Sequence, residues 1–281
     1  MRITEFTNGL YLHEKLGYVF PGDIIIDEDL VVDLPTWMTI QGKVQVAGNV
    51  VADNGLSATK SIRVTGDIES ASGSVRSGRD ICVGGSIRAA HRIVADQGIT
   101  AGTSITSTLS QITTAHGDIK ARRSIFSGKN IQAERHIIAT RGMIRADSNI
   151  QAVHGDVVSC LDMEATHGEI RANNEIKARH GNIKAGRCII SGQDIEAGGR
   201  IDCAKGIECG GNIRAESITT GWGLKANETI QAKTFIQVER RIFAGLYLYF
   251  TSQNANNTIQ CAELRKGEIC YGELHITPVE E

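Results

Sequence analysis

A repeat of six or seven residues constrains the fold of this chain more than any other feature of its sequence. The repeat is clearest over residues 170–215, where isoleucines recur at this spacing and a small residue follows each isoleucine two positions later. The isoleucines are Ile170, Ile176, Ile183, Ile189, Ile195, Ile201, Ile207 and Ile213, and the small residues are Ala172, Ala178, Ala185, Ser191, Ala197, Cys203, Cys209 and Ala215. Residues i and i+2 of a strand face the same side. Each repeat therefore predicts a short strand that buries two side chains and exposes the one between them.

Glycine, asparagine, aspartate and serine separate these strands, and they favour the backbone angles of tight corners. A strand this short cannot bury an apolar face alone, so successive coils must stack and share one core. A helix is excluded, because apolar residues spaced by six without partners at three or four make no helical face. The repeat therefore predicts an all-β fold, a single elongated β-solenoid of six- to seven-residue strand units.

The repeat also predicts where the solenoid begins and ends. Residues 1–22 lack the repeat but carry apolar side chains, and after Ala244 the pattern gives way to an aromatic patch at 246–250 and a polar loop, Ser252–Thr258. An uncovered solenoid end would expose core side chains and unpaired strand edges. We therefore expect an N-terminal cap at 1–22, the β-solenoid at 23–244 and a C-terminal cap at 245–281.

Three histidines bear on the number of strands in a coil. His154, His167 and His180 each precede a glycine and are 13 residues apart, which keeps them on every second strand. This spacing predicts two strands per coil, and a three-sided coil of about 18 residues is the alternative. In a two-strand coil the imidazoles would stack about 4.8 Å apart and form a weak candidate zinc site. No fourth ligand lies in register, so we predict exposed rings and no metal.

The two-strand register also predicts two partner-binding surfaces. It places the cations in one basic stripe that would receive an acidic partner, and the alternative is a solvated face that discourages edge pairing. It places two apolar side chains next to each other on an outer face, where they would contact a partner unless a cap or a long side chain covers them. The stripe consists of Lys120, Arg145, Arg171 and Lys184, and the apolar pair is Phe126 and Ile138.

Composition narrows the cellular setting and the partners. The formal net charge of −2 gives no general attraction to nucleic acid or to an acidic membrane. No apolar run is long enough to cross a bilayer, and the N-terminus lacks the layout of a secretory signal. Seven cysteines without disulfide-scaffold spacing are typical of a reducing compartment. We therefore expect a cytoplasmic protein that binds neither nucleic acid nor membrane.

The stretch GDIESASGSVRSGRDICVGGSIRAAHRIVADQGITAG, at 66–102, resembles the repeat of bactofilins and of the solenoid part of flagellar-assembly-protein-A-like chains. The resemblance extends over residues 44–244 and rests on short apolar strands with glycine corners. Bactofilins assemble end to end through bare terminal coils, so the resemblance implies a self-assembling scaffold. The apolar terminal segments of this chain depart from that pattern.

Catalysis has little support in the sequence. The repeat has almost no insertions to build a cleft, and P-loop, GxSxG and Cys/His/Asn patterns are missing. We therefore predict no enzyme activity and no cofactor. The sequence favours a partner-binding protein, such as an immunity protein that neutralises a cognate bacterial toxin, and a bactofilin-like cytoskeletal scaffold is the alternative. A fragment of a secreted adhesin is a third possibility, which the cysteines disfavour.

Overall fold

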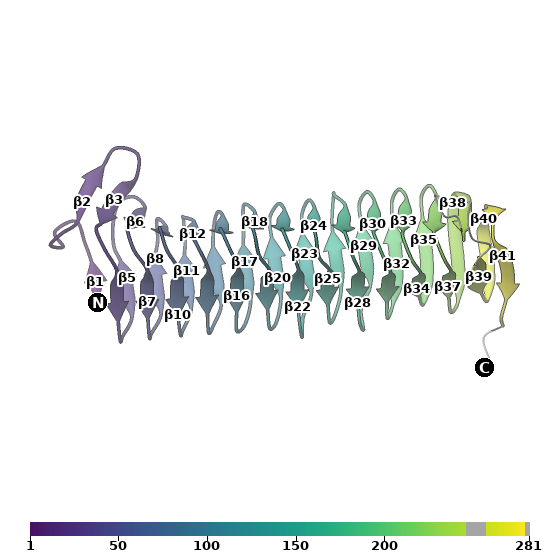
Figure 1. Ribbon diagram of the computed structural model, residues 1–281, viewed down its shortest axis with the longest axis horizontal. Helices are drawn as coiled ribbons and strands as arrows, with labels where there is room; N and C mark the ends of the chain where they lie inside the picture. The colour runs from purple at the N-terminus through teal and green to yellow at the C-terminus, as the bar shows by residue number, and fades with distance from the viewer. Residues whose placement is uncertain (246–256, 279–281) are drawn as a thin grey trace. The chain divides into compact units, whose positions relative to one another are not determined.

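The computed structural model describes residues 1–245 and 257–278 (Figure 1). These residues form strands and corners with no helix, so none of them lies in a helix that could span a membrane. The chain divides into two compact units, Met1–Arg141 and Gly142–Glu281. The predicted aromatic patch at 246–250 and most of the polar loop lie outside the described residues.

Most of the three-residue strands follow the predicted inside and outside pattern. In β10 (Ile62–Val64), Ile62 and Val64 are buried while Arg63 is exposed. In β27 (Ile170–Ala172), Ile170 and Ala172 are buried and Arg171 is exposed. The period of two therefore places the first and third side chains of these strands in the core, and the β-solenoid prediction is confirmed.

The turns have three strands, so the prediction of two strands per coil is wrong. Strand β10 pairs in parallel with β7 (Val44–Val46) and with β13 (Ile81–Val83), the third strand away on each side. A turn in this region takes 18 or 19 residues. The histidine spacing misled the prediction because a local preference for His-Gly corners is independent of which strands stack.

The three strands of a turn lie on three faces, which are lettered A, B and C in chain order within each unit. In the first unit, face A consists of β1 (Arg2–Ile3), β5 (Leu30–Val32), β8 (Val50–Ala52), β11 (Ile68–Ser70), β14 (Ile87–Ala89), β17 (Ile105–Ser107) and β20 (Ile125–Ser127). Face B consists of β3 (Gly17–Phe20), β6 (Met38–Ile40), β9 (Leu56–Ala58), β12 (Val75–Ser77), β15 (Ile93–Ala95), β18 (Ile112–Thr114) and β21 (Ile131–Ala133). Face C consists of β4 (Ile24–Ile26), β7, β10, β13, β16 (Ile99–Ala101), β19 (Ile119–Ala121) and β22 (Ile137–Ala139).

The second unit repeats this order. Its face A consists of β23 (Ile144–Ala146), β26 (Met163–Ala165), β29 (Ile183–Ala185), β32 (Arg200–Cys203) and β35 (Ser217–Thr220). Face B consists of β24 (Ile150–Ala152), β27, β30 (Ile189–Ser191), β33 (Ile207–Cys209) and β36 (Leu224–Ala226). Face C consists of β25 (Val157–Ser159), β28 (Ile176–Ala178), β31 (Ile195–Ala197), β34 (Ile213–Ala215), β37 (Ile230–Ala232), β39 (Thr258–Cys261) and β41 (Glu273–Ile276). The long strands β38 (Phe235–Ala244) and β40 (Glu263–Tyr271) each span faces A and B.

The N-terminal segment belongs to the first turn. Strand β1 pairs with β5, and β3 pairs with β6, so both extend the parallel ladders. Strand β2 (Tyr11–His13) adds an antiparallel hairpin to β3. Phe6 and Leu12 lie in the predicted cap at 1–22, but they are 94% and 67% exposed. Much of the apolar surface of residues 1–22 therefore faces solvent.

The C-terminal segment continues the solenoid. Strand β40 pairs with β38, β39 pairs with β37, and β41 pairs with β39, all in parallel. Residues 257–278 of the predicted cap at 245–281 therefore form a further turn of the solenoid. Among the described residues no strand pairs with the outer edges of β40 and β41, and we call this turn the open last turn.

Candidate functional site

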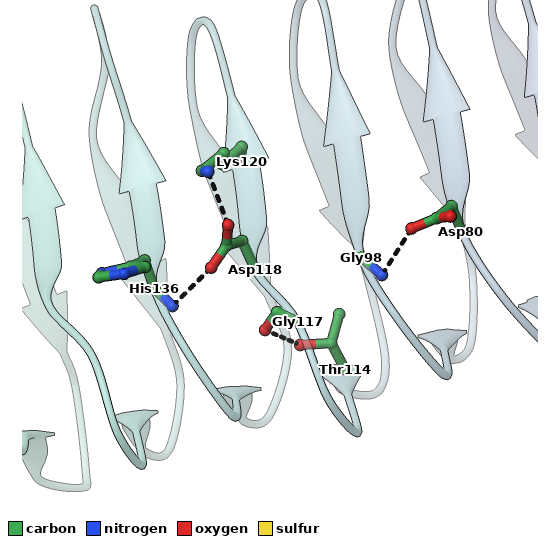
Figure 2. A network of polar contacts seen from close by, with 7 residues as sticks. All are labelled: Asp80, Gly98, Thr114, Gly117, Asp118, Lys120 and His136. Atoms are coloured by element: carbon green, nitrogen blue, oxygen red, sulfur yellow. Dashed lines mark hydrogen bonds and ion pairs between the residues drawn. The ribbon is translucent and has the colours of Figure 1, made fainter.

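The acidic residues at the corners hold successive turns together. Oδ1 of Asp118 accepts a hydrogen bond from the backbone N–H of His136 one turn later, at 3.0 Å, and Asp80 accepts one from Gly98 at 3.1 Å (Figure 2). The Nζ of Lys120 donates to the other carboxylate oxygen of Asp118 at 2.6 Å. Burial alone would raise the pKa of the Asp118 carboxyl, but these hydrogen bonds and the charges of Lys120 and His136 lower it below its ordinary value. The arrangement makes Asp118 a structural carboxylate.

Hydroxyl and thiol groups in the small inward position close the corners from inside. Oγ1 of Thr114 donates to the carbonyl of Gly117 at 2.8 Å (Figure 2). Sγ of Cys203 and Sγ of Cys209 each lie 2.7 Å from a carbonyl of the preceding turn. Burial raises the pKa of Cys203 to about 11 and that of Cys209 to about 12. Both residues therefore pack the core, as their position in the repeat predicts, and neither is a reactive nucleophile.

The three candidate metal ligands do not meet. His154 precedes β25 on face C, His167 precedes β27 on face B, and His180 precedes β29 on face A, so they occupy three different corners. His167 instead faces Asp147 at 3.7 Å. The stacked histidine column was wrong because it depended on two strands per turn. In the part of the chain that the structure describes, no three His, Cys, Asp or Glu side chains are placed to hold a metal ion.

The four predicted cations do not form one continuous basic stripe. Lys120 lies on face C of the first unit. Within the second unit, Arg171 lies on face B, which is not the face that carries Arg145 and Lys184. Arg145 and Lys184 share face A of the second unit, but Glu164 lies between them in the ladder. All four cations of the stripe have a carboxylate within ion-pair distance. Their role in binding an acidic partner stays a prediction, and it cannot depend on a continuous stripe.

The predicted apolar pair is separated for the same reason. Phe126 lies on face A beside Thr106, and Ile138 lies on face C beside Lys120. Both side chains are half-buried. Phe126 and Ile138 therefore lie on different faces of the first unit, each beside a polar residue of the preceding strand. A partner contact at either residue remains untested.

The outer faces of the second unit carry alternating charges. A carboxylate oxygen of Glu164 lies 3.3 Å from Arg145 Nε, and the other lies 3.9 Å from Lys184 Nζ, all on face A. On face B, Lys225 pairs with Glu208 at 2.9 Å. Opposite charges on adjacent strands of a ladder attract, whereas like charges repel. A shallow groove on face B is lined by Arg171, Ile190, Glu208 and Lys225, which are the outward side chains of neighbouring strands.

The open last turn is the feature that the sequence analysis missed. Its inward side chains continue the apolar ladders, since Leu274 lies beside Ile259 and Ile276 beside Cys261. Ile259 and Cys261 are buried, but Leu274 is 39% exposed and Ile276 is 51% exposed. On β40, Leu264 and Ile269 are half-buried. The signal was in the sequence, because apolar residues of 259–276 keep the alternation of a strand.

Comparisons with known proteins add no family to this description. The chain matches no protein-family model, no curated protein and no solved structure. The β-solenoid fold therefore rests on the structure itself, and the resemblance to bactofilins and flagellar-assembly-protein-A-like chains stays a prediction from the repeat.

Proposed function

We propose that this chain is a non-catalytic protein-binding β-solenoid whose open last turn is a docking end. The observation that supports the proposal is the exposure of Leu274 and Ile276, whose equivalents one turn earlier are fully covered. An unpaired strand edge offers a row of backbone donors and acceptors to another strand. Proteins commonly bind extended segments in this way, with backbone hydrogen bonds for affinity and side-chain pockets for specificity.

The rigidity of the scaffold suits this function. An inner strand such as β31 is hydrogen-bonded to both neighbouring turns, so little conformational freedom is lost when a partner docks. A bound strand would cover the half-exposed inward side chains of β40 and β41. An immunity protein that engages a toxin domain is one protein of this kind, and a toxin domain is the partner that we expect from the sequence.

Self-assembly is the second candidate function, and the same open turn favours it. Terminal caps that close both ends of a solenoid would prevent end-to-end assembly. Among the described residues, β41 pairs only with β39 and β4 pairs only with β7, so each has one strand edge without a partner strand. A head-to-tail contact of two different surfaces grows into an open filament unless the rotation closes a ring.

Light scattering with size-exclusion chromatography over a concentration range tests both candidates. The informative variant is Leu274→Lys with Ile276→Lys, because charges on an edge strand block pairing. Leu109→Lys with Leu161→Lys is the matched control, since these apolar side chains are exposed at corners. Filaments that the first variant abolishes and the control retains would support self-assembly.

If the protein is a monomer at all concentrations, the next experiment is partner capture from native lysate. If the chain binds a partner at the open last turn, the wild type and the control variant should capture the same protein. The variant Leu274→Lys with Ile276→Lys should not capture that protein. Absence of both assembly and capture would contradict the proposed function. Thermal unfolding of each variant checks that the turns remain folded.

A further inference from the structure

Three cations and a tryptophan stack at one corner of the second unit. They are Arg187, Lys205, Trp222 and Arg240, which we call the basic corner, and they join face A to face B in consecutive turns. Backbone hydrogen bonds link them in order, from Lys205 N–H to Arg187 at 2.9 Å, from Trp222 N–H to Lys205 at 3.1 Å and from Arg240 N–H to Trp222 at 2.9 Å. The residues therefore follow each other at the spacing of adjacent strands, about 4.8 Å. The corner belongs to the turns that carry β30, β33, β35 and β38, coloured green in Figure 1.

Trp222 organises the corner. Its indole is 53% exposed and lies between two cations, with Lys205 Nζ at 5.6 Å and Arg240 Cζ at 5.3 Å from the ring centroid. Cation–π attraction at these distances holds both charged groups beside the ring. The corner thus presents an apolar aromatic surface with positive charge on both sides of it.

The positive charge of this corner is not neutralised within the described residues. In residues 1–245 and 257–278, no carboxylate lies within ion-pair distance of Arg187, Lys205 or Arg240. Glu239, which precedes Arg240, is engaged by Lys266 at 2.5 Å. This contrasts with the outward cations of faces A and B, such as Arg145 and Lys225, which have acidic partners in the ladder.

We propose that the basic corner binds an extended acidic segment of a partner protein. Carboxylates of the segment would pair with Arg187, Lys205 and Arg240, and an apolar or aromatic side chain would pack on Trp222. The guanidinium groups of arginine suit carboxylates because they offer two parallel donors. The four residues span three turn spacings, about 14 Å, which an extended peptide covers in about four residues. Exposed tryptophan and arginine side chains are also the residue types that dominate binding energy at protein interfaces.

A nucleic acid fits the corner less well. Single-stranded nucleic acid is bound by several aromatic side chains that stack successive bases and by a broad positive groove. The basic corner has one aromatic side chain, and Glu239 and Glu268 line the groove beside Trp222 and Arg240. These carboxylates would repel a continuous row of phosphates, whereas a peptide can place uncharged residues opposite them.

This inference rests on the proposed function in that the ligand is a protein, but it concerns a surface distinct from the open last turn. The probe is a fluorescein-labelled decapeptide composed of two copies of Glu-Asp-Phe-Glu-Asp, and the reference peptide replaces each acid by its amide. Fluorescence anisotropy should show that the full-length protein binds the acidic peptide and not the reference, with affinity that falls as salt rises. The double variant Lys205→Glu/Arg240→Glu and the variant Trp222→Ala should each weaken binding about tenfold or more.

The matched control is Arg123→Glu/Lys129→Glu, which makes the same change of charge at exposed corner cations of the first unit. This control, and Leu274→Lys with Ile276→Lys, should leave peptide binding unchanged. No binding by the wild type, or equal loss in the Arg123/Lys129 control, would overturn the inference. The inference would also be overturned if an oligothymidylate bound more tightly than the acidic peptide and the same corner variants lost that binding. The corner would then be assigned to nucleic acid. Because the open last turn is tested by separate variants, failure of the corner leaves the docking-end experiment intact.

Discussion

Asp118 on one turn accepts a hydrogen bond from the backbone N–H of His136 on the next, 3.0 Å from its Oδ1. The same contact recurs at other corners with asparagine as the acceptor, for example from the N–H of Arg200 to Asn182 at 2.8 Å. A carboxylate or amide at the last position of a corner therefore bonds to the turn above it. The contact gives a hydrogen-bond acceptor to a backbone N–H at the corner, which lies outside the hydrogen bonds between the strands.

Replacement of Asp118 by alanine should destabilise the protein. The variant leaves the N–H of His136 without its acceptor in a half-buried corner, which costs about 1 to 2 kcal/mol of unfolding free energy. Asp118→Asn is the control, because Asn182 makes the same contact naturally, and it should lose less than half as much. Urea unfolding followed by circular dichroism measures both values. Equal losses in the two variants would show that the backbone contact does not stabilise the corner.

The contribution of Asp118 to stability should disappear in acid. The folded state lowers the pKa of this carboxyl, so the carboxylate form stabilises folding above the ordinary aspartate value of about 3.9 and the contribution is lost as pH falls through the lower folded pKa. The stability difference between wild type and Asp118→Asn should therefore be larger at neutral pH than at about pH 2.5. Urea midpoints of the two proteins across this range provide the measurement, and a constant difference would contradict the expected titration.

The cysteines should differ sharply in their reactivity toward a thiol reagent at mildly alkaline pH. Cys82 and Cys270 are exposed and should react in the folded protein. Cys203 and Cys209 are buried, with pKa values raised to about 11 and about 12, and should react only after unfolding. Mass spectrometry of peptides from native and urea-unfolded samples identifies the labelled residues. Early labelling of Cys209 in the native protein would mean that the turns around it open readily.

Two glycines of neighbouring corners should respond in opposite ways to alanine. A Cβ at Gly102 would overlap the carbonyl oxygen of Gly84 in the preceding turn, whereas a Cβ at Gly98 would meet only ordinary contacts with Asp80 and Asp118. Gly102→Ala should therefore cost about 1 to 3 kcal/mol, since a well-packed backbone must shift. Gly98→Ala should be neutral or slightly stabilising, because it restricts the unfolded chain. Thermal unfolding of the pair measures the contrast, and similar midpoints would show that the corner adjusts without cost.

The sequence determined the local part of this structure. The alternation of Ile170, Arg171 and Ala172 specifies which side chains face the core, because the side-chain period of a strand is a property of the backbone. Corner residues such as Asp118 and Gly102 are recognisable for the same local reason. The β-solenoid could therefore be predicted from the repeat alone.

Only the tertiary structure decided which strands stack. The pairing of β10 with β7 and β13 depends on hydrogen bonds between residues about 18 positions apart, and a motif on every second strand does not report them. That one choice placed Arg171 and Lys184 on different faces of the second unit and dispersed the histidines. It also brought together Lys205, Trp222 and Arg240, which are 17 and 18 positions apart in the chain. Local periodicity sets the direction of each side chain, whereas its neighbours across turns follow from how many strands close a turn around the shared core.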